Sequence, residues 1–213
     1  MNIAFFFGEM VIIVLMNILV WIKYNVFSTE MLKKRRGKIL LITYILVTAG
    51  ECILVGFKEY NWMTLIKICL TYLLISGIGL IDYKFHIIPN KLLFYAILLR
   101  LFILIIEYYY NSDQFMEVVL ECIGGALIGF GILFLTHLLS KGGIGMGDVK
   151  LFGVIGFIIG LRGTYNTLFY SLIFLVLYSC IGMMKKELTR KSMIPFGPFV
   201  YLGYLITFGM GAF

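Results

Sequence analysis

Hydrophobic runs long enough to cross a lipid bilayer recur from one end of this 213-residue chain to the other. With 62% hydrophobic and only 14% charged residues, the composition excludes a water-soluble domain. Backbone polar groups cannot stay unpaired in lipid, and the runs are too long for barrel strands, so they predict helices. We predict a single-domain (1–213), all-α polytopic membrane bundle. Its eight segments are 3–22, 39–57, 63–81, 92–106, 118–139, 151–161, 168–184 and 199–213.

The basic residues lie mainly in every second connection between these segments. Connections one, three, five and seven carry 14 Lys and Arg, the other connections carry two, and Lys67 and Arg100 lie inside segments. Since Lys and Arg collect in cytoplasmic loops, the odd-numbered connections are predicted to be cytoplasmic and both termini outside an inner (cytoplasmic) membrane. The net charge of +7 therefore reflects membrane topology, and no nucleic-acid partner is expected.

A charged, glycine-rich stretch, residues 140–150 (SKGGIGMGDVK), precedes the sixth segment. Each glycine costs a helix about 1 kcal/mol relative to alanine, so something must require this composition. Segment 151–161 provides only about 16 Å of helix, half a hydrocarbon core. The helix is therefore expected to begin near Gly142, which places Asp148 below the membrane surface and inside the protein. Gly156 and Gly160 offer a close-packing face downstream.

Two aspartates, Asp82 and Asp148, lie at segment ends on the same predicted side. An ionisable group at membrane depth is a functional candidate by default. Two carboxyl groups forced together share a proton. One can then activate water while the other polarises a carbonyl, which hydrolyses a peptide without a metal or a covalent intermediate. We predict that Asp148, at a helix N-terminus, is the ionised partner and Asp82 the protonated one. Taken singly, each aspartate could instead be a helix cap or a segment end.

The other ionisable groups are interpreted as structural. Glu51 and Lys67 lie in adjacent segments and are predicted to form an ion pair. Arg100 is expected to face the bundle interior and meet an acidic group, either a buried structural partner or one on a substrate helix. Six carboxylates are expected to be solvated in loops: Glu30, Glu59, Glu107, Asp113, Glu117 and Glu187.

The four cysteines all fall within hydrophobic segments, without a C-x-x-C pair or zinc-ligand spacing. They are expected to be small buried side chains. The sequence predicts no metal site and no cofactor.

Three motifs follow one another in the second part of the chain: residues 82–90 (DYKFHIIPN), 143–151 (GIGMGDVKL) and 193–203 (MIPFGPFVYLG). They resemble the first-aspartate motif, the G-x-G-x-G-D-x-K-L signature and the P-F-G-P segment of the type IV prepilin peptidases, which are GxGD intramembrane aspartic proteases. The resemblance runs from about residue 73 to the C-terminus and implies that Asp82 and Asp148 are catalytic. It also implies substrate-binding or site-shaping roles for Gly143, Gly145, Gly147, Lys150, Pro89, Asn90, Pro195, Phe196, Gly197 and Pro198.

The resemblance implies that the chain removes the leader from prepilin or pseudopilin substrates in the bilayer, at the cytoplasmic membrane face. Many bacterial members insert a cytoplasmic domain with two C-x-x-C pairs after the first span, where this chain has only the short basic loop 23–38. The resemblance therefore gives no support to the N-methyltransferase activity that often accompanies the peptidase. The compact form is similar to peptidases of Tad-type or archaellin-like systems.

Three alternatives remain beside this reading. One is another GxGD protease with preflagellin-like or presenilin-like substrates, although the P-F-G-P segment favours the prepilin peptidases. Another is a transporter that uses Asp82 and Asp148 as ion ligands, for which inverted repeats are expected and none is found. The last is a catalytically silent assembly factor. The sequence indicates no oligomeric state.

Overall fold

The computed structural model describes residues 61–211, except 111, 142 and 190–191. The chain divides into two compact units, Met1–Leu65 and Ile66–Phe213, and all contacts given below lie within the second unit. The predicted segments 3–22 and 39–57, the basic loop 23–38, Glu51 and Cys52 fall outside the described residues.

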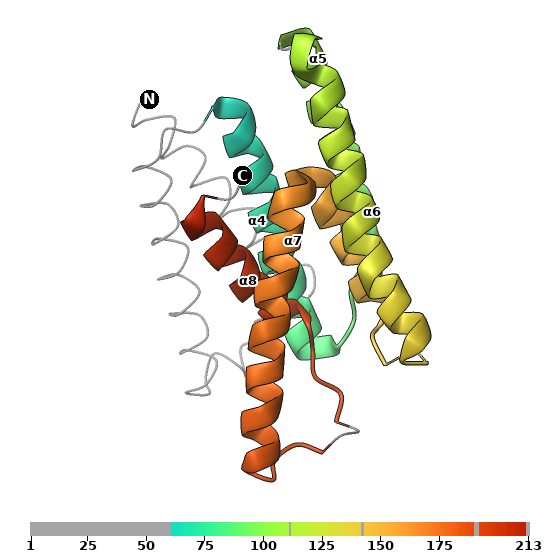
Figure 1. The fold of residues 1–213 in the computed structure, drawn as a ribbon, viewed down its shortest axis with the longest axis vertical. Coiled ribbons are helices and arrows are strands. Elements are labelled where there is room, and N and C mark those ends of the chain that lie inside the picture. The colour runs from blue at the N-terminus through green and yellow to red at the C-terminus, as the bar shows by residue number, and fades with distance from the viewer. Residues whose placement is uncertain (1–60, 111, 142, 190–191, 212–213) are drawn as a thin grey trace, which may run out of the picture. The chain divides into compact units, whose positions relative to one another are not determined.

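The described residues form helices joined by short connections, with no strand among them (Figure 1). Four helices are long and apolar enough to cross a membrane, and a fifth apolar helix is shorter. The predicted all-α, multi-pass membrane fold is thus confirmed. The elements are α4 (Trp62–Phe85), α5 (Asn90–Tyr110), the 3-10 helix η1 (Ser112–Gln114), α6 (Phe115–Leu139), α7 (Met146–Met184) and α8 (Gly197–Met210).

The predicted segments 151–161 and 168–184 are the two arms of one element, α7, which is broken at Gly160 (φ 76°, ψ −173°). This backbone conformation favours glycine, which has no Cβ to clash. The helix begins at Met146, so the expected start near Gly142 is wrong. Gly145 instead takes an extended conformation (φ −65°, ψ 137°) as the N-cap, since glycines weaken a helix. The first arm, residues 146–160, is therefore about 22 Å long.

Glycines bring α6 and α7 into backbone contact. A Cβ atom on Gly125 would overlap the backbone of Gly156 and Gly160, and one on Gly156 would overlap the backbone of Gly125. Gly129 lies against the carbonyl of Phe152 in the same way. Small residues allow helices to approach closely in membranes, where van der Waals contact is a main source of stability. The predicted close-packing face of Gly156 and Gly160 is confirmed.

We expect Gly156→Ala to lower the free energy of unfolding by about 1–3 kcal/mol, because the new methyl group forces α6 and α7 apart. Gly131→Ala is the matched control, since a Cβ atom on this α6 residue meets nothing within 4 Å. That change should be neutral or stabilise the helix by up to about 1 kcal/mol. Unfolding of the purified protein in detergent measures both. Equal effects of the two changes would contradict this packing.

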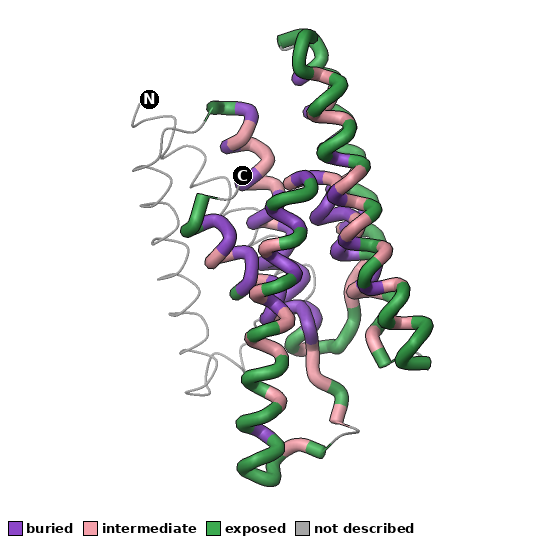
Figure 2. The backbone as a smooth tube through the Cα atoms, in the orientation of Figure 1, coloured by how far each residue is buried: buried purple, intermediate pink, exposed green. Residues whose placement is uncertain are grey.

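The buried residues gather where α4, the first arm of α7 and α8 meet (Figure 2). The hydroxyl of Tyr204 in α8 donates a hydrogen bond of 2.9 Å to the carbonyl of Ile68 in α4. Gly203 in α8 lies against Thr167 and Ser171 of α7, so that a Cβ atom at this position would overlap them. These contacts hold the middle of α8 against α4 and α7, and Gly79 of α4 meets Gly197 at the start of α8.

Candidate functional site

Asp82 lies in the last turn of α4 and is only 6% exposed. Its Oδ2 atom accepts a hydrogen bond of 2.7 Å from the backbone N–H of Gly197, the first residue of α8. The first N–H groups of a helix have no partner within the helix, and a carboxylate there satisfies them. Asp82 therefore caps α8, and the P-F-G-P segment fixes the orientation of its carboxyl group.

Local sequence explains why α8 begins at this place. Phe196 is buried and stacks on Phe152 of α7, with ring centroids 5.7 Å apart. Pro198 occupies the first turn of α8, where the N–H that proline lacks is not needed by the helix, and Pro195 lies just before it. Gly197 itself cannot carry a side chain without displacement, because a Cβ atom would come within 3.0 Å of the Asp82 Cβ atom.

Asp148 is the third residue of α7 and is half-buried. Its backbone N–H donates to the carbonyl of the N-cap residue Gly145 at 3.0 Å. Gly147, next to Asp148, packs on Ile88 in the loop that follows Asp82, and Phe152, one turn after Asp148, stacks on Phe196, which precedes the Gly197 bonded to Asp82. These contacts bring the two aspartates, which come from helix ends far apart in the sequence, to one site.

Two of the predicted motif glycines adjoin Asp148 or the loop beside it. A Cβ atom on Gly147 would lie 3.1 Å from the Ile88 side chain, so the bare glycine lets α7 approach the α4–α5 loop. A Cβ atom on Gly145 would lie 3.0 Å from the Oδ2 atom of Asp148. The first turn of α7 is thus packed against the segment that follows Asp82.

The remaining predicted residues lie at the edge of this site. Gly143 closes a turn with Ser140, whose Oγ atom accepts its N–H at 3.0 Å. Pro89 precedes α5 and its carbonyl accepts the N–H of Leu92, while Asn90, the first residue of α5, is exposed. The Lys150 side chain is exposed.

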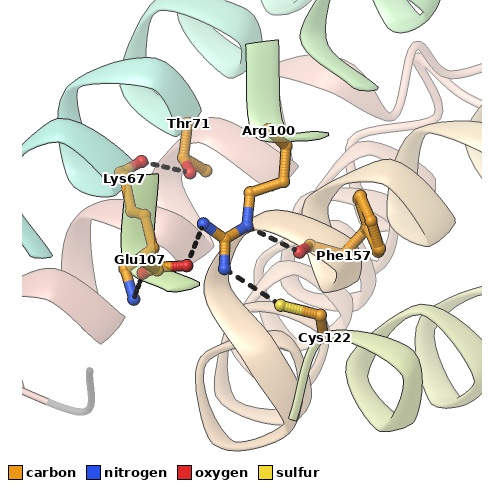
Figure 3. A network of polar contacts seen from close by, with 6 residues as sticks. All are labelled: Lys67, Thr71, Arg100, Glu107, Cys122 and Phe157. Atoms are coloured by element: carbon orange, nitrogen blue, oxygen red, sulfur yellow. Dashed lines mark hydrogen bonds and ion pairs between the residues drawn. The ribbon is translucent and has the colours of Figure 1, made fainter. Parts of the chain in front are cut away.

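A second polar cluster joins α4, α5 and α6 (Figure 3). Glu107 forms ion pairs with Lys67 (3.1 Å) and Arg100 (2.8 Å). The guanidinium of Arg100, only 1% exposed, also donates to the carbonyl of Phe157 (3.3 Å) and to Sγ of Cys122 (3.0 Å). Of the two kinds of acidic partner predicted for Arg100, the structure shows the buried structural one.

This cluster corrects two sequence predictions. Glu107 is 3% exposed and lies in α5, so its assignment to a solvated loop is wrong. The helix runs past the predicted end of its segment and carries Glu107 two turns beyond Arg100, on the same face. Lys67 pairs with Glu107, whereas its predicted partner Glu51 lies outside the described residues. Of the described cysteines, Cys122 is buried as expected, but Cys180 is exposed, so that expectation is wrong for Cys180.

A cavity of about 390 Å³ adjoins the second cluster and reaches the break in α7. Its lining includes Lys67, Arg100, Glu121 and Arg162. The Oε2 atom of Glu121 accepts the N–H of Leu161 at 3.0 Å, a donor that the break at Gly160 leaves without a helical partner. Glu121, an acid at membrane depth, is therefore a helix cap. Gly211, just after the C-terminus of α8, also lines the cavity. The cavity therefore lies at the end of α8 that is opposite to Asp82.

Sequence reasoning missed three residues around the aspartates. Gly79, one turn before Asp82, touches Gly197 and allows α4 and α8 to meet. Ile88 packs on Gly147. His137, in the last turn of α6, contacts the carbonyl of Ile144 through its Nδ1 atom at 2.6 Å. Gly79 could have been found from its spacing of three from Asp82, but no pattern in the sequence marks the other two.

The chemistry available at the first site is that of two carboxyl groups, one bonded to the backbone N–H of Gly197 and the other lying against Gly145. Among the described residues, no group of three or more His, Cys, Asp or Glu side chains could hold a metal ion. A pair of carboxyl groups in a partly buried site can work as an acid and a base on one substrate bond.

Comparisons with known proteins agree with this chemistry. A model described as the type IV leader peptidase family matches residues 68–180. A prepilin leader peptidase/N-methyltransferase of Bacillus subtilis (strain 168) is 28% identical over 134 residues, which cover 63% of this chain and 51% of the relative. A protein of the same description from Xanthomonas campestris pv. campestris is 26% identical over 203 residues, covering 90% of this chain and 68% of the relative. The chain thus spans about half the length of the first of these relatives. No solved structure matches it.

Proposed function

Because this chain belongs to the type IV leader peptidase family, we propose that it is a membrane aspartic endopeptidase that removes the N-terminal leader from prepilin-like proteins. The observation that carries the proposal is the meeting of Asp82 and Asp148 in one site. Both relatives are described as prepilin leader peptidases, which supports prepilins or pseudopilins as the substrate class.

In the proposed mechanism, one carboxylate takes a proton from water as the water oxygen attacks the scissile carbonyl carbon. The other aspartate, in its protonated form, gives its proton to the carbonyl oxygen, and a tetrahedral intermediate forms. Its collapse breaks the C–N bond, and a proton passes to the leaving amine. We assign the base to Asp148 and the acid to Asp82. The Asp82 carboxyl group accepts the N–H of Gly197, which a protonated or an ionised carboxyl group can do, so this contact does not distinguish the two roles.

We further propose that cleavage takes place near the cytoplasmic face of the inner membrane. Lys84, Lys91 and Lys150 lie in helix ends near the two aspartates and Lys141 in the α6–α7 loop, and such basic residues collect on the cytoplasmic side. Only the peptidase activity is proposed. The chain has no C-x-x-C pair, the feature that accompanies the methyltransferase in the resembling family.

Co-expression of the full chain with a prepilin tests this function. We expect a faster-migrating pilin, whose new N-terminus lies at the junction between the basic leader and the hydrophobic helix. Sequencing of that N-terminus distinguishes this cut from general proteolysis. The proposal would be contradicted if none of a panel of prepilins and pseudopilins lost its leader when co-expressed with the folded, membrane-inserted chain.

The contact between Gly197 and Asp82 gives a second test. We expect Gly197→Ala to lower the cleavage rate about 10²-fold, because the methyl group displaces the Asp82 carboxyl group or α8, and small misplacements have effects of this size. Gly209→Ala in the same helix is the matched control, since a Cβ atom there meets nothing within 4 Å. The control should cleave at the wild-type rate. Equal rates for both variants would show that Gly197 does not position Asp82.

A further inference from the structure

We propose that His137 is a positioning residue for Asp148 and acts through the peptide group that joins Ile144 to Gly145. The inference rests on the proposed peptidase function and adds a residue from outside the three motifs. His137 lies in the last turn of α6, and it reaches across the glycine-rich loop to the start of α7.

The first step is the contact of the imidazole with the loop. The Nδ1 atom of His137 lies 2.6 Å from the carbonyl oxygen of Ile144. A carbonyl oxygen only accepts hydrogen bonds, so the imidazole carries its proton on Nδ1 and donates it. The side chain is half-buried. The bond is short, and it ties the loop to α6.

The second step is the geometry of the peptide group. The carbonyl of Ile144 and the N–H of Gly145 belong to the same planar unit and point in opposite directions. The bond from His137 to the Ile144 carbonyl therefore also fixes the orientation of Gly145. The carbonyl of Gly145 accepts the N–H of Asp148 at 3.0 Å, and the Oδ2 atom of Asp148 lies 3.0 Å from the place that a Cβ atom would take on Gly145. A rotation of the peptide group breaks the bond to His137 and moves Gly145 away from the Asp148 side chain.

The third step is the need for an external support. The loop contains Gly143 and Gly145, and glycine adopts many backbone conformations at little cost. Within the loop, the turn of Gly143 on Ser140 holds the chain only up to the residue before Ile144. His137 supplies a fixed point on α6, a helix that is itself held against α7 by Gly125 and Gly129. The position of Gly145 against Asp148 is thereby set before substrate binds.

The test compares three replacements of His137 in the full chain. Asparagine carries an amide nitrogen at the same distance from Cβ as Nδ1, and glutamine carries one at the distance of Nε2. Phenylalanine keeps the size of the ring without a donor. We expect His137→Phe and His137→Gln to lower kcat by about 10–100-fold, the range seen for supporting residues, with KM changed less than about twofold. His137→Asn should restore kcat to within about threefold of wild type.

Thr136→Val is the matched control, because the Thr136 hydroxyl bonds only the carbonyls of Ile132 and Leu133 in its own helix. It should cleave at the wild-type rate. A second readout needs no substrate: the NMR shift of the Gly145 amide in ¹⁵N-glycine-labelled protein. This signal should move in His137→Gln and in Asp148→Asn, and stay in place in His137→Asn and Thr136→Val.

The two readouts separate the possible failures. A Gly145 amide unmoved by His137→Gln and His137→Phe, with kcat also unchanged, overturns the positioning role. Equal losses of kcat in the Asn and Gln variants overturn it as well, since they show only that histidine packs there. If the wild-type chain cleaves no prepilin while the Gly145 signal behaves as expected, the peptidase proposal fails and the contact through the peptide group is retained.

Discussion

Replacing either Asp82 or Asp148 with asparagine is expected to lower prepilin cleavage by about 10²–10⁴-fold, the usual contribution of a general acid or base. An asparagine amide can neither take the proton from water nor protonate the carbonyl oxygen. The two losses should not add in the double variant, because the aspartates act as one unit. Initial rates of leader removal by purified protein in detergent measure all three variants.

The structure allows the chemical and structural roles of Asp82 to be separated. The amide oxygen of Asp82→Asn can still accept the N–H of Gly197, so the start of α8 should be preserved. Asp82→Leu leaves this buried donor without a partner and should lower the free energy of unfolding by about 1–3 kcal/mol as well. Asp113→Asn, an exposed change in η1, is the control for loss of a carboxylate. Wild-type rates in Asp82→Asn and Asp148→Asn would show that the aspartates are not the catalytic pair.

The second large effect concerns stability. Glu107→Leu is expected to lower the free energy of unfolding by about 3–5 kcal/mol, because it leaves the cations of Lys67 and Arg100 next to each other without their shared anion. Unfolding in mixed detergent measures the loss. Glu117→Leu removes an exposed carboxylate near the start of α6 and should change stability by less than about 0.5 kcal/mol.

A triple variant distinguishes the loss of an anion from the loss of a well-packed side chain. Replacing Lys67, Arg100 and Glu107 together with leucine removes all the charges of the cluster, and a buried ionic group replaced by apolar residues is often neutral or stabilising. We expect this variant to be more stable than Glu107→Leu alone. If the triple variant is less stable than Glu107→Leu, the unpaired cations are not the cause of the loss, and the packing of the Lys67 and Arg100 side chains stabilises the bundle instead.

The features that the sequence determined by itself are those with a local signal. Long apolar runs predicted α4, α5 and α6 to within a few residues, because a membrane helix satisfies its backbone within its own segment. The aspartates stood out because charge in an apolar run is costly. The Gly156 and Gly160 face was also predictable, since small residues at a spacing of four lie on one side of a helix.

Tertiary structure decided whatever depends on a neighbouring helix. Glu107 is buried because α4 and α5 bring two cations to it, although its place near the end of a run is typical of a loop. The exact start of α7 and its break follow from single glycines whose backbone conformation the sequence does not specify. Likewise, the partner of the Asp82 carboxyl group is a backbone N–H at the start of α8, and His137 of α6 meets the loop before Asp148. A linear pattern records which residues can be buried, and only the packing of helices determines which groups meet there.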